Sequence, residues 1–189
     1  IENFIAYTPL SSLTIDENNN SYKIDGNAVV SKDGQTLVIG FSNSNIPNTV
    51  KRIDSYAFSG VNFANTKLSL PDSVTEIGEY AFRDTNLVEV TLSKNVASVE
   101  TGAFSDTKSL LGVTIKNPNM VLSSKGSDIA SNVFENSAIN CLVFEGTLDQ
   151  FKAMFASKEV KAVPTDLKTA KLVNSDGTIN RIILANLTY

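Results

Sequence analysis

The sequence repeats itself at intervals of a little more than twenty residues. Three blocks that each begin with a valine end in an Ala-Phe pair, at Phe58, Phe82 and Phe104, and a looser block ends at Phe134 after an insertion at residues 123–128. The steps between these phenylalanines are 24, 22 and 30 residues. A unit this short cannot bury its apolar edge alone, so the period predicts a stack of units that share one continuous core.

Apolar residues with a fixed spacing follow each of these phenylalanines. The sets are Leu87, Val90 and Leu92; Leu110, Val113 and Ile115; and Ile139, Leu142 and Phe144. Leu10, Leu13 and Ile15 follow Phe4 in the same way, which predicts a strand there and a chain that begins inside a repeat, whereas the Phe58 block keeps Leu68 and Leu70 but has Asn65 in the first place. The last two apolar residues of a set lie two apart and so share one strand face. The sequence therefore predicts a β-rich solenoid with about five short parallel strands, one per repeat, and a spine of stacked rings at Phe4, Phe58, Phe82, Phe104 and Phe134.

Two other segments interrupt and close this pattern. Asp33-Gly34 is a hairpin turn signal within an insertion at about residues 22–41, which we expect to pack across the coil near its start. Thr147 and Gln150 form a capping-box pattern that predicts a helix at about 148–157, followed by strands at 160–163, 170–174 and 178–187. We therefore divide the chain into a solenoid at 1–146 and a helix and hairpin at 147–189 that close the same core.

The segment from Leu70 to Phe82, with the sequence LPDSVTEIGEYAF, resembles the BspA-type leucine-rich repeats of bacterial surface proteins. The asparagine-rich loop before Tyr22, the hairpin at 31–34 and the run from Phe144 into the helix are also similar to segments around such repeats, so the resemblance covers about residues 4–157. The long insertion before Phe134 departs from the family pattern. The resemblance implies an extracellular or cell-surface protein that binds host or matrix proteins, and it supplies no binding residues that could be transferred.

The composition offers little to catalysis. The sequence has no histidine and a single cysteine, Cys141, which excludes a Ser-His-Asp triad and an imidazole metal site, and we predict no catalytic, metal or cofactor residues. The acidic and amide residues at 16–20 favour a turn over a calcium site. Cys141 is expected to be a buried or half-buried structural residue, and Tyr56 and Tyr80 are expected to pack on each other rather than to form a ligand platform. A net charge of −4 without a basic patch makes nucleic acid an unsuitable partner.

The outward face of the predicted strands is the candidate binding surface, because stacked repeats present extended surfaces to partners. Its residues are Ser12, Thr14, Ser69, Glu89, Thr91, Ser93, Gly112, Thr114, Lys116 and Val143. Small side chains with little charge suit a broad protein contact better than a small-molecule pocket. We therefore expect a non-catalytic protein-binding or adhesion module, outside the cell or on its surface, that does not insert into a membrane. The alternatives are a repeat or spacer attached to an enzyme elsewhere in a longer protein, and a purely structural stalk.

Overall fold

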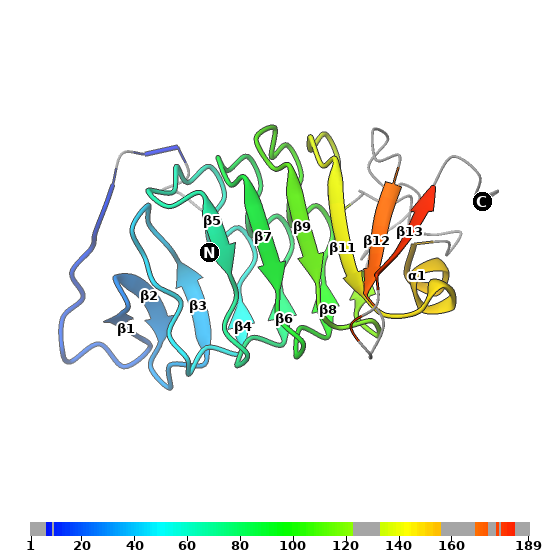
Figure 1. The fold of residues 1–189 in the computed structure, drawn as a ribbon. Coiled ribbons are helices and arrows are strands. Elements are labelled where there is room, and N and C mark those ends of the chain that lie inside the picture. Colours follow the sequence, from blue (N-terminus) through cyan, green and yellow to red (C-terminus); the bar gives the residue numbers. More distant parts are fainter. Residues whose placement is uncertain are drawn as a thin grey trace.

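The computed structural model describes residues 7–8, 10–122, 133–155, 169–173, 177 and 179–183, and in it the chain coils between two β-sheets (Figure 1). The first sheet is seven-stranded and the second six-stranded. The first runs in the order β1 (Tyr22–Asp25), β2 (Ala28–Ser31), β3 (Thr36–Ile39), β4 (Arg52–Ile53), β6 (Glu76–Ile77), β8 (Ser98–Val99) and β10 (Val121–Leu122). The second runs β13 (Ile179–Ile183), β12 (Thr169–Val173), β11 (Cys141–Glu145), β9 (Gly112–Ile115), β7 (Glu89–Leu92) and β5 (Lys67–Ser69).

Each central repeat contributes one strand to each sheet, so the expectation of one strand per repeat is wrong. The extra strands are short, two residues each in β4, β6, β8 and β10, and they pair in parallel with their neighbours. Two residues are too few to show an alternating pattern in a sequence, although the inward member of each pair is buried. The predicted parallel strands of the second sheet are present as β5, β7, β9 and β11.

The predicted spine of stacked phenylalanines is confirmed for the described residues. The ring centroids of Phe58 and Phe82 lie 5.2 Å apart, those of Phe82 and Phe104 5.1 Å, and those of Phe104 and Phe134 5.7 Å, all in stacked orientation. All four side chains are at most 2% exposed. Phe4, the fifth predicted member, lies outside the described residues.

The predicted packing of the two corner tyrosines is also confirmed. The rings of Tyr56 and Tyr80 are stacked with centroids 5.2 Å apart. Gly102 takes the same place in the next repeat, and a Cβ atom there would lie 2.3 Å from the Tyr80 ring. All three residues have positive φ, at 61°, 54° and 60°, so the backbone geometry repeats while the side chain changes. The tyrosine ladder thus ends on a glycine, whose hydrogen leaves room for the last ring.

The strand predicted at residues 10–15 is absent from the described structure. This segment has no strand conformation, and Leu10 and Leu13 are 48% and 42% exposed. Ile15 instead packs against a separate small cluster formed by Val29, Ile39 and Phe41. The likeness to the repeat signature does not suffice, because a strand also needs a neighbouring strand with which it can pair. The place beside β5, the first strand of the second sheet in chain order, belongs to residues 42–48 and not to this segment.

The predicted hairpin around Asp33-Gly34 is confirmed by the antiparallel pairing of β2 with β3, and β1 adds a third antiparallel strand. The hairpin does not pack across the coil, however, because β3 pairs in parallel with β4 and so extends the first sheet. The turn expected at residues 16–20 is present: the Asp16 carboxylate accepts the N–H of Asn18 at 2.8 Å.

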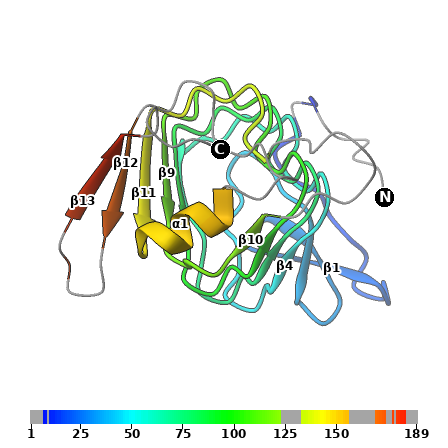
Figure 2. The same cartoon turned by 90° about the vertical axis from the view of Figure 1, so that its right-hand side faces the viewer.

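At the other end, helix α1 (Leu148–Phe155) lies across the opening of the coil (Figure 2). The Thr147 N–H donates to Gln150 Oε1 at 2.9 Å, and the Gln150 N–H donates to Thr147 Oγ1 at 3.2 Å, so the capping box is confirmed. Strand β12 pairs in parallel with β11 and antiparallel with β13, which confirms the terminal hairpin. The strand predicted at 160–163 lies outside the described residues.

Candidate protein-binding face

The outward face of the second sheet carries two straight rows of side chains. The register places Lys67, Glu89, Gly112 and Cys141 in one row, and Ser69, Thr91, Thr114 and Val143 in the other. Between them, the alternate residues of the same strands point into the core, with Val90, Val113 and Leu142 each at most 3% exposed. The strict alternation of strand side chains fixes both rows, so burying the aliphatic residues forces the others outward.

The predicted residues of this face differ in exposure. Ser69, Glu89 and Lys116 are exposed, and Lys116 lies just beyond the end of β9. Four more are half-buried: Thr91, Gly112, Thr114 and Val143. The structure brings six of the seven to the outward side of the second sheet, and it places Lys116 at the margin of the sheet, directly after β9. Their role in binding remains a prediction.

Three of the predicted residues do not belong to this face. Ser93 is 3% exposed, and its hydroxyl donates to the Pro71 carbonyl at 3.3 Å, because the chain turns into the corner directly after Leu92. Ser12 and Thr14 are exposed, but they lie in the segment that failed to form a strand. The Ser11 carbonyl accepts a hydrogen bond from Asn27 at 2.9 Å, which places this segment beside the turn between β1 and β2.

A shallow hollow of about 240 Å³ lies on the face where β7, β9 and β11 meet. Gly112 sits in its middle, between Glu89 and Cys141 of the neighbouring strands, and a Cβ atom there would have only an ordinary contact at 3.4 Å with Glu89 Cγ. The missing side chain therefore creates the hollow. The Cys141 thiol is free and exposed, so the expectation of a buried or half-buried cysteine is wrong.

The face carries little charge. Lys67 Nζ and Glu89 Oε1 form an ion pair at 2.9 Å across β5 and β7, with both side chains more than half exposed. Such an exposed pair contributes at most about 1 kcal/mol and is weakened by salt. The rest of the two rows is hydroxyl, methyl and thiol surface, which can form a broad contact with little desolvation cost.

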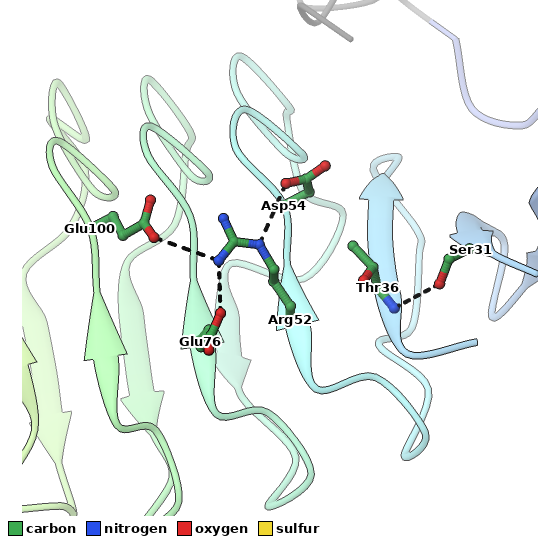
Figure 3. A network of polar contacts seen from close by, with 6 residues as sticks. All are labelled: Ser31, Thr36, Arg52, Asp54, Glu76 and Glu100. Atoms are coloured by element: carbon green, nitrogen blue, oxygen red, sulfur yellow. Dashed lines mark hydrogen bonds and ion pairs between the residues drawn. The ribbon is translucent and has the colours of Figure 1, made fainter. Parts of the chain in front are cut away.

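The opposite face, on the first sheet, contains a cluster that sequence analysis missed. Arg52 Nη1 lies 2.8 Å from Glu76 Oε2 and 3.5 Å from Glu100 Oε1, while Arg52 Nε lies 3.6 Å from Asp54 Oδ1 (Figure 3). Burial lowers the pKa of the guanidinium, but its hydrogen bond to Glu76 and the other two carboxylates outweigh this and raise it. The available signal was the recurrence, one repeat apart, of a charged residue directly before an isoleucine, at Arg52-Ile53 and Glu76-Ile77.

Two kinds of feature are absent from the described residues. Within them, no three or more histidine, cysteine, aspartate and glutamate side chains come together so that they could hold a metal ion. None of the helices in the described part of the chain is long and apolar enough to cross a membrane.

The fold is similar to two bacterial proteins of known structure. A leucine-rich repeat protein from Eubacterium ventriosum is 21% identical, with a TM-score of 0.56 over 73% of this chain and 37% of that one. The pneumococcal vaccine antigen PcpA is 19% identical, with a TM-score of 0.55 over 87% of this chain and 45% of that one. The chain thus spans less than half the length of either neighbour, and at these identities the likeness concerns the fold alone.

A search of curated proteins finds no match to the sequence. Residues 38–161, by contrast, match the BspA type leucine rich repeat region in six copies. This match covers well over half of the chain and includes every Phe of the described spine. The chain therefore belongs to the BspA-type leucine-rich repeat family.

Proposed function

We propose that this chain is a non-catalytic protein-binding module, and that a partner protein docks on the outward face of the second sheet. The observation that carries the proposal is the row of Ser69, Thr91, Thr114 and Val143, held in register on four adjacent strands over a buried aliphatic core. A preorganised, weakly charged surface of this kind loses little conformational entropy and little solvation when a partner covers it. The shallow hollow at Gly112 gives a partner side chain a place to enter.

We also propose that the protein acts outside the cell or on its surface, in adhesion to host or matrix proteins. Support comes from the family and from the likeness to a vaccine antigen, since antigens used in vaccines are commonly accessible from outside the cell. The stacked repeats form a solenoid in this proposal, with residues 1–146 as its repeat region and residues 147–189 closing the same core.

The test is a double variant, Thr91→Arg with Thr114→Glu, which adds bulk and charge at the centre of the face. Soluble host and matrix proteins are screened for binding to the unmodified chain by surface plasmon resonance, and each ligand found is measured again with the variant. We expect the variant to lose at least about tenfold in affinity, which corresponds to about 1.4 kcal/mol.

The matched control is Thr75→Arg with Ser98→Glu, which places the same charges on adjacent turns at the first sheet, directly before β6 and in β8. Circular dichroism should show that both variants keep the fold. A ligand that binds the face variant as well as the unmodified chain, and loses affinity for the control, would move the site to the first sheet.

A further inference from the structure

Strand β5 has a neighbour on one side only. The sheet order ends at β5, and no other strand of the described residues pairs with its second edge. On the side of β7, the Leu70 N–H donates to the Thr91 carbonyl at 3.0 Å and the Thr66 carbonyl accepts from Glu89 at 3.3 Å. Because main-chain groups alternate in direction along a strand, the N–H and C=O groups of Lys67 and Ser69 are directed to the open side.

The place beside this edge belongs to residues 42–48, which form no strand. Ile46-Pro47 corresponds to Leu70-Pro71 of the next turn, since Val50 and Val74 donate the same bonds to these prolines, at 3.0 and 3.1 Å. The segment therefore takes the position of a repeat strand in the register, although its backbone does not have strand conformation.

Contacts on its other side hold this segment away from β5. The Asn45 N–H donates to the Gly26 carbonyl at 2.8 Å, and Asn27 Nδ2 donates to Asn43 Oδ1 at 2.6 Å. The Ser44 hydroxyl also donates to the Asn27 carbonyl. Gly26 and Asn27 both have positive φ, as the tight turn between β1 and β2 requires, and this turn anchors the segment.

A hollow of about 670 Å³ lies between the anchored segment and the open edge of β5. Ile46, Phe63 and Leu68 are among its lining residues and also pack on the main core, so they form an apolar floor. The rest of the lining is mainly asparagine and serine, and among the described residues that line the hollow Lys67 alone is charged. The hollow thus combines an open strand edge, an apolar floor and one lysine, whose ammonium group is paired with Glu89 at 2.9 Å.

We propose that this hollow binds an extended, uncharged or acidic peptide segment of a partner protein, which adds to β5 as a parallel strand. One residue of a parallel strand donates to the carbonyl of residue i−1 and accepts from the N–H of residue i+1. Around Leu68, these groups are the Lys67 carbonyl and the Ser69 N–H. The Lys67 N–H is already bonded to Asn65 Oδ1 at 3.1 Å, so the new strand leaves no donor unpaired there.

Side chains of the added segment supply the specificity. A residue opposite Leu68 turns its side chain toward the apolar floor, and its two neighbours point outward to the asparagine and serine side chains. Lys67 is paired with Glu89 at 2.9 Å, so it adds only a weak preference for a carboxylate over a basic side chain on the segment. The proposal shares with the proposed function that the partner is a protein, but its site is the open edge of β5, which borders the outward face at Lys67 and Ser69.

The experiment titrates the chain with a library of short capped peptides and follows backbone amide shifts by NMR. The library has valine, isoleucine or leucine at alternating positions, with serine, threonine or glutamate between them. Peptide concentrations of about 1 mM suit the weak affinity expected of a single short segment. Under these conditions we expect chemical-shift changes centred on the amides of Lys67, Leu68 and Ser69. The Ser69 amide should also exchange more slowly with solvent, because its N–H becomes bonded.

Two matched comparisons test the hydrogen-bonding mode. Ser69→Pro removes the edge N–H and should weaken binding at least about tenfold, whereas Ser69→Ala keeps the N–H and should change it less than about twofold. The same peptide with alternate backbone nitrogens methylated should bind as weakly to the unmodified chain as the parent peptide binds to Ser69→Pro.

Three results would overturn the proposal: no shifts with any peptide pool, equal binding of methylated and unmethylated peptides, or shifts produced by soluble oligosaccharides in place of peptides. The last would make the hollow a carbohydrate site. Thr114→Glu alone, on β9 and separated from β5 by β7, should leave peptide binding at β5 unchanged, so this proposal and the proposed function can fail separately.

Discussion

The central repeats and the first turn of the coil share one backbone path but differ in what fills it. In the centre, the Phe58 N–H donates to the Ala81 carbonyl at 2.7 Å and the Phe82 N–H donates to the Ala103 carbonyl at 2.8 Å. In the first turn, the Gly40 N–H donates to the Ala57 carbonyl at 2.8 Å in the same way. Gly40 therefore occupies the spine position that phenylalanine holds elsewhere.

The glycine is required because the neighbouring ring fills its space. A Cβ atom on Gly40 would lie 1.8 Å from Cε1 of Phe58. Phe58 also contacts Phe63, with ring centroids 5.2 Å apart, so the end of the spine is packed on two sides. The comparison shows that backbone register continues past the point where the side-chain signature stops.

The largest expected effect comes from removing a ring in the middle of the spine. Phe82→Ala should lower the free energy of unfolding by about 3–5 kcal/mol, since Phe82 is fully buried between two stacked rings. Phe41→Ala, in the small cluster of the first turn, should cost less, about 2–3 kcal/mol, because that cluster has fewer members and can collapse around the change. Urea unfolding followed by circular dichroism measures both, and equal losses would show that the two regions are packed alike.

A smaller effect should follow from filling the glycine position. Gly40→Ala should cost about 1–3 kcal/mol, because the added methyl group forces the Phe58 ring out of the stack. Gly112→Ala is the matched control, since its new Cβ atom meets only Glu89 Cγ at 3.4 Å, and it should stay within about 0.5 kcal/mol. If both variants are equally stable, the Phe58 ring does not depend on the gap at Gly40.

The same contrast explains how much the sequence could predict. The spine from Phe58 to Phe134 and the strands of the second sheet were predictable, because large apolar residues mark them at fixed spacing. Gly40 was not, since a spine position without a side chain leaves no mark in a hydrophobic pattern. The strand expected at residues 10–15 failed for the opposite reason, because its pattern was present but the place beside β5 belongs to residues 42–48.

The candidate face was predicted in part for similar physical reasons. Thr91 and Thr114 follow from strand alternation, and the structure places them side by side. Ser93 follows from the same alternation, but the strand ends at Leu92 and the rule ends with it. The hollow beside β5 depends on the tether between Asn45 and Gly26, a contact between segments that a repeat pattern does not encode.

The smallest expected effect concerns a polar chain that joins successive turns of the central repeats. Asp106 Oδ1 accepts a hydrogen bond from Asn136 at 3.0 Å, and its Oδ2 pairs with Arg83 Nε at 3.0 Å. In the turn that contains Phe58, the position equivalent to Asp106 is Gly60, which has no side chain to make these contacts. The hydrogen bond from Asn136, with a further contribution from Arg83, lowers the pKa of the Asp106 carboxyl. A carboxyl whose pKa is lowered by folding stabilises the folded state above its unfolded pKa of about 3.9, and this contribution is lost as the pH falls through the folded value.

Asp106→Asn should therefore reduce stability at neutral pH by less than about 1 kcal/mol, since the ion pair is partly exposed, and the difference from the unmodified chain should shrink below about pH 4. Asparagine is the appropriate substitute because Asp106 has a φ of 57°, a conformation that asparagine also tolerates. Arg83→Gln should keep part of the pH dependence, because the bond from Asn136, the larger cause of the lowered pKa, remains. Urea unfolding of the three proteins across the acid range measures the effect. Parallel stability curves for Asp106→Asn and the unmodified chain would show that this contact between turns contributes nothing through its charge.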